Sequence, residues 1–224
     1  MAQIFDDWPE KYDLWFETPM GRLIKRYESK LLLKLLAPKP GEVILDAGCG
    51  TGIFTADILE TGARVVGLEL ALSMLRRALT KFPGRTFQPV IGDIRRLPFA
   101  DDSFQKTISI TAIEFIQDAK TAVEELFRVT KSKGLIVVAT LNSLSPWAQQ
   151  RMAAAQNGHS LFKHAIFRSP DEIKRLSPVE SIVQTAIHFE KNDAPEIVAE
   201  IENAGSESGL NTGAFLAARW IKPA

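Results

Sequence analysis

Residues 43–52 read Val43-Ile44-Leu45-Asp46-Ala47-Gly48-Cys49-Gly50-Thr51-Gly52, an apolar run followed by an acid and a glycine-rich turn. An apolar run without alternation predicts a strand that is buried on both faces, as at the centre of a parallel sheet. The next residues, 53–59, have helical spacing, so the unit is a strand, a turn and a helix. Glycines in such a turn let the backbone approach a ligand and leave N–H groups free at the helix start. The unit therefore predicts a site for a nucleotide-like ligand.

The spacing of the glycines separates two kinds of ligand. A dinucleotide fingerprint has the order G-x-G-x-x-G, with the pyrophosphate seated on the helix N-terminus. Here Gly48, Gly50 and Gly52 give G-x-G-x-G, and Asp46 stands two residues before the first of them. A carboxylate at that position would repel a pyrophosphate and suits a ligand with an amino group and a positive centre. The spacing thus disfavours a nicotinamide-dependent oxidoreductase.

Residues 45–52 resemble the first motif of the class I S-adenosylmethionine (SAM)-dependent methyltransferases, and the order of later motifs through 141 continues the resemblance. Within that class the chain is similar to small-molecule enzymes related to the ubiquinone and menaquinone biosynthesis group. The resemblance implies an α/β, Rossmann-like sheet of seven strands, six parallel and the last antiparallel, with helices on both faces. It also implies that SAM is the cofactor and that its methyl group passes to an acceptor.

The resemblance assigns cofactor contacts along the chain. Glu69, at the end of the second predicted strand, would accept hydrogen bonds from the ribose hydroxyls, although it could instead only cap the next helix. Met74 would wall the adenosine, or be a core residue. Asp93 would contact the adenine amino group and Ile94 would pack on the ring. The full set of expected cofactor contacts is Tyr12, Asp46, Ala47, Gly48, Cys49, Gly50, Glu69, Leu70, Met74, Gly92, Asp93, Ile94, Ser109 and Ile110.

Residues 1–40 are predicted to form a helical N-terminal lid. Aromatic residues crowd an amphipathic stretch there, namely Phe5, Trp8, Tyr12, Trp15 and Phe16. At helical spacing such residues are more often core than ligand contacts. Residues 12–22, however, resemble the leader that folds over the cofactor in some small-molecule methyltransferases. Tyr12 is therefore a candidate for cofactor binding and for catalysis.

The acceptor side is expected beyond the fourth predicted strand, 106–110, because ligands lie at the carboxyl edge of such sheets. Phe115 stands where many relatives carry a histidine, which weakens a general-base role for this loop and leaves Glu114 as a polar candidate. Residues 142–168 lack clean periodicity and suit a flap over the active site. His164 in that flap is the expected titratable group near the substrate, although a flap histidine is more often structural or exposed.

One domain is predicted for 1–224, divided into the lid (1–40), a cofactor-binding core (41–141), the flap (142–168) and the C-terminal part of the sheet (169–224). Ser169 and Glu172 predict a capping box at a helix start. Strands are predicted at 179–190 and 213–222, with a helix over 194–203 between them.

Composition limits the classes of partner. Lys and Arg together number 27, as do Asp and Glu, so no global field favours nucleic acid or an anionic membrane. The single cysteine, Cys49, excludes a cysteine-rich metal site, and no signal peptide or 18-residue apolar run is present. We expect a cytoplasmic monomer or homodimer without a metal, acting on the oxygen, nitrogen or carbon of a small molecule. A protein or RNA methyltransferase and a non-catalytic SAM-binding module are the alternatives.

Overall fold

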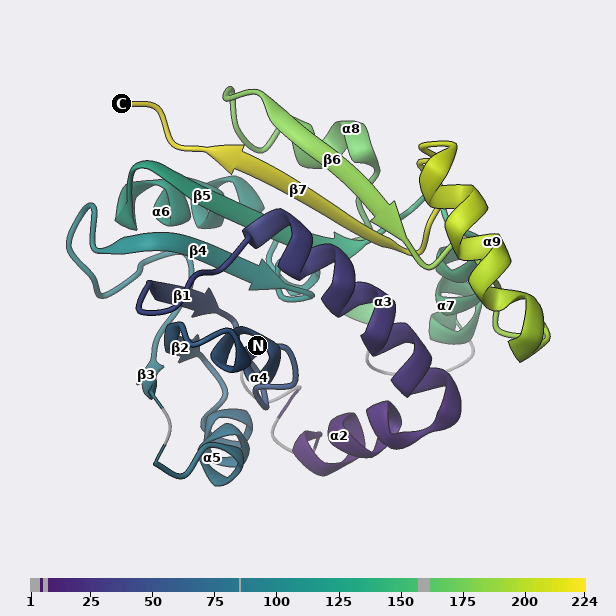
Figure 1. Ribbon diagram of the computed structural model, residues 1–224, viewed down its shortest axis with the longest axis horizontal. Coiled ribbons are helices and arrows are strands. Elements are labelled where there is room, and N and C mark those ends of the chain that lie inside the picture. The colour runs from purple at the N-terminus through teal and green to yellow at the C-terminus, as the bar shows by residue number, and fades with distance from the viewer. Residues whose placement is uncertain (1–4, 6–7, 85, 157–161) are drawn as a thin grey trace.

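The computed structural model describes residues 5, 8–84, 86–156 and 162–224, and in that part of the chain it holds one seven-stranded sheet (Figure 1). The strand order is β3-β2-β1-β4-β5-β7-β6. The helical elements are α2 (Pro9–Glu17), α3 (Pro19–Leu36), α4 (Thr55–Glu60), α5 (Leu72–Lys81), η1 (Ile113–Phe115), α6 (Ala119–Val129), α7 (Pro146–Gln156), η2 (Phe162–His164), α8 (Pro170–Lys174) and α9 (Pro195–Glu207). The strands are β1 (Val43–Ala47), β2 (Arg64–Glu69), β3 (Phe87–Ile91), β4 (Phe104–Ile110), β5 (Thr130–Leu141), β6 (Ser181–Ala186) and β7 (Phe215–Ile221).

The direction of the strands agrees with the predicted topology. β1 pairs in parallel with β2 and β4, and β2–β3 and β4–β5 are also parallel. β7 is antiparallel to both β5 and β6, so it alone is reversed. Ile44 and Leu45 of β1 are fully buried, as expected of a central strand that is covered on both faces. The predicted Rossmann-like fold is confirmed.

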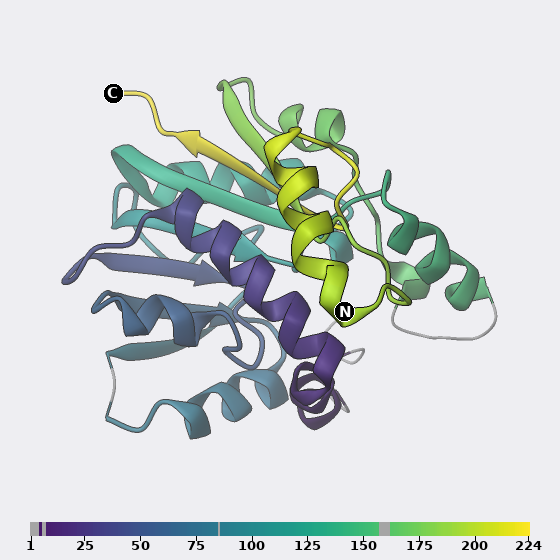
Figure 2. The ribbon, with the colours of Figure 1, turned by 45° about the vertical axis from the view of Figure 1, so that its right-hand side comes forward.

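Two apolar layers hold the helices against the sheet. One layer joins α3, α4 and α9 through residues such as Ile24, Ile58 and Val198, and Figure 2 shows α3 and α9 lying on that same side. The opposite layer joins α6 and α8 through residues such as Leu126 and Ile173. Helices on both faces leave only the edges of the sheet for ligands, which places a site at the carboxyl ends of the strands.

Two elements differ from expectation. α7 forms inside the predicted flap, where the side chain of Trp147 donates a hydrogen bond to the carbonyl of Phe189 at 2.7 Å. β5 begins at Thr130, within residues 128–134, which the sequence predicts as a turn before a strand over 135–141, and its pairing with β4 shifts register beyond Phe104. Lys133 adopts a φ of 64° within this irregular stretch. Residues 157–161 of the predicted flap, and 1–4 and 6–7 of the predicted lid, lie outside the described residues.

The capping box predicted at Ser169 is present: its hydroxyl accepts from the backbone N–H of Glu172, and the Glu172 carboxylate accepts from that of Ser169. Among the helices that the structure describes, none combines the length and the apolar content needed to cross a membrane.

Candidate functional site

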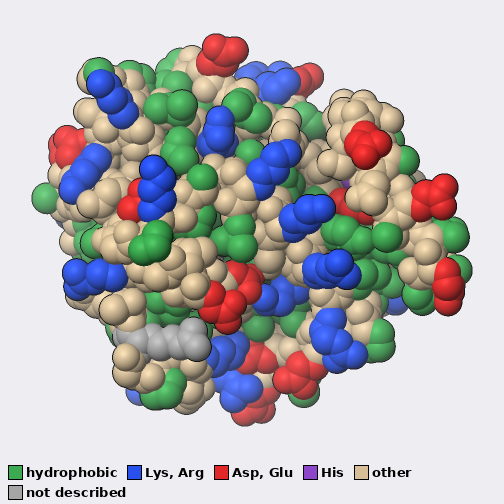
Figure 3. Space-filling view, viewed as in Figure 1, with side chains coloured by type: hydrophobic (Ala, Val, Ile, Leu, Met, Phe, Trp, Pro, Cys, Tyr) green, Lys and Arg blue, Asp and Glu red, His purple; other side chains and the backbone are tan. Residues whose placement is uncertain are grey.

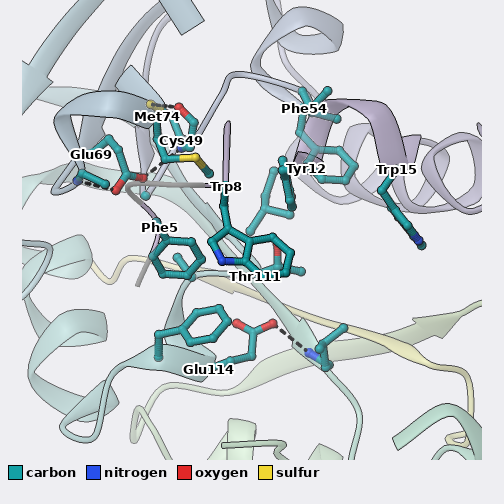
Figure 4. Close-up of a pocket in the computed structure, with 18 of the residues that line it drawn as sticks. Phe5, Trp8, Tyr12, Trp15, Cys49, Phe54, Glu69, Met74, Thr111 and Glu114 are labelled. Carbon is teal, nitrogen blue, oxygen red and sulfur yellow. Dashed lines mark hydrogen bonds between the residues drawn. The ribbon is translucent and has the colours of Figure 1, made fainter. Parts of the chain in front are cut away.

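A cavity of about 960 Å³ lies at the carboxyl ends of the central strands, and residues of α2, α3, η1 and α7 contribute to its wall (Figure 4). Its lining is mostly apolar and rich in aromatic rings, including Phe5, Trp8, Tyr12, Trp15, Phe115 and Trp147. Pockets for drug-sized ligands span roughly 300–1,000 Å³. This cavity therefore lies at the upper end of that range.

The glycine turn forms one wall of the cavity. Gly48, Gly50 and Gly52 have φ values of +82°, +54° and +78°, a region in which any other side chain would be strained. A Cβ at Gly48 would lie 2.5 Å from the Cβ of Ala112. At Gly50, by contrast, the nearest atom to a Cβ would be the Met74 methyl at 3.5 Å. Gly48 is thus required for packing as well as conformation, whereas the turn at Gly50 borders open space.

Asp46 ends β1 beneath this turn with only 2% of its surface exposed. One carboxylate oxygen, Oδ2, accepts a hydrogen bond from the Thr55 hydroxyl at 2.6 Å. The other, Oδ1, is buried without a partner in the described part of the chain. Burial raises the pKa of Asp46 to about 7 against the effect of the Thr55 hydrogen bond, and nearby Glu69 raises it further. A buried, unpaired acceptor costs about 1–3 kcal/mol, so Asp46 is suited to a hydrogen-bond donor from a ligand.

Glu69 lies where β2 ends beside the same turn. Its Oε2 accepts from the backbone N–H of Gly50 at 3.0 Å, and its Oε1 accepts from those of Leu70 and Ala71 at 2.8 and 2.9 Å. These bonds hold the carboxylate in place. They also fill three of its roughly four acceptor positions, which leaves about one, on Oε2, for a ligand.

The remaining wall at this end comes from β3 and α5. Met74 and Ile94 are buried and line the cavity, while Leu70 lines it with 41% of its surface exposed. Asp93 also lines it and forms an ion pair with Arg95 at 2.6 Å. The hydrogen bonds of Arg95 lower the pKa of Asp93, so the carboxylate is ionised at neutral pH.

A protein-family model described as a methyltransferase domain matches residues 45–138, which include this turn and the carboxyl ends of β1, β2, β3 and β4. Residues 45–138 are thus similar in sequence to methyltransferase domains. A demethylmenaquinone methyltransferase of Beutenbergia cavernae is 35% identical over 151 residues, which cover 66% of this chain and 60% of that protein. A malonyl-(acyl-carrier protein) O-methyltransferase of Serratia marcescens is 29% identical over 187 residues, covering 74% and 72% of the two chains. The chain thus spans less than two thirds of the length of the first relative.

Solved structures extend the likeness of the methyltransferase domain to the whole chain. A SAM-dependent methyltransferase of Thermotoga maritima matches with a TM-score of 0.77 and 23% identity, over 99% of this chain and 100% of that one. A structure described as a cyclase matches with a TM-score of 0.72 and 13% identity, over 99% and 94%. At these identities the likeness concerns the fold, and activity has to be argued from the site.

The predicted lid packs on the rest of the chain through aromatic contacts. Phe5 packs edge-on against Phe115, with ring centroids 4.9 Å apart, and Phe16 packs against Phe54 at 5.8 Å. Phe16 is a buried core residue that also lines the cavity, as Trp8 and Tyr12 do. Burial, together with nearby acidic groups, raises the pKa of Tyr12 well above its ordinary value. Its hydroxyl therefore stays protonated and is unsuited to act as a base.

Several predicted site residues take other positions. Ala47 and Ser109 are fully buried within their strands, and neither lines the cavity. Alternate residues of a strand point to opposite faces of the sheet, so these two side chains point away from the cavity while their neighbours Asp46 and Ile110 line it. His164 is exposed at the end of η2, outside the cavity lining, whereas Phe162 of the same turn lines it. Cys49 does line the cavity, and burial raises the pKa of its thiol, so it packs as a small neutral group.

Sequence reasoning missed Glu28 of α3 and Arg151 of α7, both of which line the cavity beside Glu114. Glu28 had a readable signal, since it interrupts the apolar face formed by Ile24, Tyr27 and Leu31. Arg151 had no such signal in the sequence, because α7 carries no periodic apolar pattern that would show which of its side chains face inward. Glu114 itself is fully buried, and its Oε1 accepts a long hydrogen bond, 3.3 Å, from the backbone N–H of Leu141.

Proposed function

We propose that the protein transfers a methyl group from SAM to a small-molecule acceptor by in-line displacement. The observation that carries this proposal is the unpaired, buried Oδ1 of Asp46 beneath a glycine turn, in a large cavity lined mostly by apolar groups. SAM supplies, when bound, a methyl group on a positively charged sulfur. The match of 45–138 to the methyltransferase family supports the same donor.

The residues at the cofactor end fit the parts of this donor. Asp46 would accept hydrogen bonds from its amino group, and Glu69 would accept one from the ribose through Oε2. Asp93 would contact the adenine amino group, with Met74 and Ile94 against the ring. In these assignments a carboxylate accepts from each of the ligand's hydrogen-bond donors, which are the amino group, the ribose hydroxyls and the adenine amino group. Apolar side chains pack against the adenine ring.

The chain's own contribution to the reaction is alignment and exclusion of water. Aromatic rings of the lid and of α7 enclose the acceptor end of the cavity, where water would compete with the acceptor. Holding two reactants in position is worth roughly 7–11 kcal/mol in well-oriented model reactions. Tyr12, as a protonated hydroxyl beside Thr111, would donate a hydrogen bond in this space rather than remove a proton.

A small-molecule acceptor is favoured over a polynucleotide. The formal net charge is zero, and both signs of charge occur across the face shown in Figure 3. A polynucleotide requires a basic surface, whereas the enclosed aromatic cavity suits an acceptor of limited size.

The test is formation of S-adenosylhomocysteine (SAH) from SAM, followed by mass spectrometry, across amines, phenols, carboxylates, a peptide mixture and RNA. We expect SAH with one class of small molecule, and at least a tenfold weaker SAM affinity in Asp46→Asn, since a charge-assisted hydrogen bond is lost. Asp171→Asn, an exposed acid on α8, is the matched control. Tight SAM binding without SAH from any class would instead support the non-catalytic binding module.

A further inference from the structure

A second group of charged side chains lines the cavity on the side away from Asp46. Glu28 comes from α3, Glu114 from η1 and Arg151 from α7, so three elements that are distant in sequence meet there. Glu28 and Glu114 are buried. The Oε2 of Glu114 and the Nη1 of Arg151 have no hydrogen-bond partner in the described residues, and no hydrogen bond to the carboxylate of Glu28 is found there.

Neither carboxylate of this cluster has an ion-pair partner among the described residues. Two guanidiniums lie near: Arg151 acts on both acids, and Arg168 acts on Glu114. The guanidinium of Arg151 lies 5.4 Å from the ring centroid of Trp147 and 5.6 Å from that of Phe162, and the guanidinium of Arg168 donates to the carbonyls of Ile113 and Ile116. Lys25, a cation of α3 near Glu28, forms an ion pair with Asp57 at 2.8 Å. The nearby cations are thus held by other groups, and both carboxylates lack a hydrogen-bonded counter-charge.

Burial shifts the pKa values of both acids. Burial raises the pKa of Glu28 to about 8, because the attraction of Arg151 does not offset desolvation and the charge of Glu114. Burial likewise raises the pKa of Glu114 to about 7, against the effects of its hydrogen bonds and of Arg168. Both acids are thus poised to exchange a proton near neutral pH.

The rest of the acceptor end is aromatic. The rings of Phe5, Trp8 and Tyr12 line the cavity together with Glu114, and Figure 4 shows the Trp8 ring above the Glu114 carboxylate in that view. Ring faces attract cations, and they bury the flat body of an aromatic ligand. A carboxylate acceptor would add a third negative charge beside Glu28 and Glu114, whereas a protonated amine would give these unpaired carboxylates a direct hydrogen-bond donor.

We propose that the acceptor is a primary or secondary amine on an aromatic or apolar body, bound with its nitrogen at Glu28 and Glu114. This inference rests on the proposed function and specifies its substrate. The ammonium group gives one proton to the Glu28 carboxylate and becomes a neutral amine. The nitrogen lone pair then forms the N–C bond to the methyl carbon while the S–C bond breaks, and that bonding pair stays on sulfur. The products are the methylated ammonium, SAH and protonated Glu28, which returns its proton to solvent.

The test compares three ligands of nearly equal shape, 2-phenylethylamine, 2-phenylethanol and 3-phenylpropionate, by calorimetric titration into the protein saturated with SAH. We expect the amine to bind at least tenfold more tightly than the other two. Glu28→Gln should weaken amine binding at least tenfold while changing the affinities for the alcohol and for SAH by less than twofold. Glu124→Gln, an exposed acid on α6, is the matched control and should change none of them.

The outcomes separate the two proposals. If SAH itself fails to bind, the proposed function is wrong. If SAH binds but the carboxylate or the alcohol binds as well as the amine, or if none of the three binds, the amine assignment alone is overturned. The same conclusion follows if Glu28→Gln leaves the amine affinity unchanged.

Discussion

The buried carboxylate of Asp13 accepts hydrogen bonds from three side chains, the Thr51 hydroxyl at 2.6 Å, Arg77 at 2.7 Å and Lys81 at 2.6 Å. Thr51 belongs to the glycine turn, and the two cations belong to α5. One residue of the lid thus connects α2 to the turn and to the helix that follows β2. Burial alone would raise the pKa of Asp13, but these three hydrogen bonds outweigh it and lower the pKa.

We predict that Asp13→Asn lowers the free energy of unfolding by about 1–3 kcal/mol at pH 7, because charge-assisted bonds to a buried group are lost. A group whose pKa is lowered by folding stabilises the protein above its unfolded pKa, about 3.9, and this stabilisation is lost as pH falls through the folded value. The difference between wild type and variant should therefore narrow below about pH 4. Urea denaturation from pH 3 to 7 measures this difference in the free energy of unfolding, and Glu60→Gln, at an exposed acid, is the control. A difference that stays constant down to pH 3 would refute the linkage.

At this scale, the sequence predicts positions best where residues belong to a local motif. Asp46, Gly50 and Glu69 line the cavity because the strand, the turn and the acid are fixed by a few adjacent residues, and their contacts with a cofactor stay predictions. Glu28 and Arg151 could not, since their meeting depends on how α3 and α7 cross over the sheet. His164 was misplaced for a related reason: titratable chemistry in a flap says nothing about which way the side chain points.

The junction between α2 and α3 depends on a close backbone approach. A Cβ at Gly21 of α3 would lie 2.0 Å from the carbonyl oxygen of Trp15. Alanine in place of glycine usually stabilises a helix by up to about 1 kcal/mol. Here the overlap outweighs that gain, since backbone atoms must shift.

We predict that Gly21→Ala lowers the free energy of unfolding by about 1–3 kcal/mol, as other overpacked sites do, and weakens SAH binding because α2 is displaced. Lys30→Ala, an exposed change in the same helix, should stay within about 0.5 kcal/mol of wild type. Chemical denaturation measures the free energy of unfolding, and calorimetric titration measures the affinity for SAH. A stabilised Gly21→Ala protein with normal SAH affinity would contradict the packing of the lid.

The η1 turn is braced from the far side by Arg168, whose guanidinium donates to the carbonyls of Ile113 at 2.8 Å and Ile116 at 3.1 Å. We predict that Arg168→Met costs about 2–4 kcal/mol, since two buried acceptors lose their donors. Amide hydrogen exchange over 113–116 should become faster. Arg175→Met, at an exposed arginine that follows α8, provides the comparison. Unchanged exchange in η1 would show that Arg168 does not hold this turn.

Elements were predicted well where apolar pattern and packing agree, as in β1, β2 and the capped helix at Ser169. They were predicted less well where long-range contacts decide the outcome. α7 has little periodic pattern, and the buried bond from Trp147 to Phe189 fixes its position. β5 starts early because Thr130 pairs with Phe104 of β4, and the prediction of a turn over 128–134 does not take this long-range pairing into account.

For the whole molecule, the number of strands and the reversal of the last one followed from the family resemblance. The cavity could not be foreseen, because segments near residues 8, 28, 114 and 151 form its acceptor end only after the sheet has assembled. The lid and flap boundaries stay predictions.

A ligand that contacts the lid, the glycine turn and β3 together should stabilise the entire fold. SAH at 100 times its dissociation constant adds about 2.7 kcal/mol to the free energy of unfolding. For a chain of this size we predict a rise in melting temperature of about 5–11 °C. Scanning calorimetry with and without SAH measures it. A change of under 1 °C at saturation would mean that the ligand does not bind the folded state in this cavity.

The most direct test of the account is calorimetric titration of the protein with SAM, SAH and NAD, in parallel with Glu69→Ala and the exposed control Glu60→Ala. We predict micromolar binding of SAM and SAH, about 8 kcal/mol, at least a tenfold loss in Glu69→Ala, and no loss in the control. NAD should not bind, because Asp46 faces the position of its pyrophosphate. Binding of NAD alone, or of none of the three, would contradict the cofactor assignment and leave only the fold.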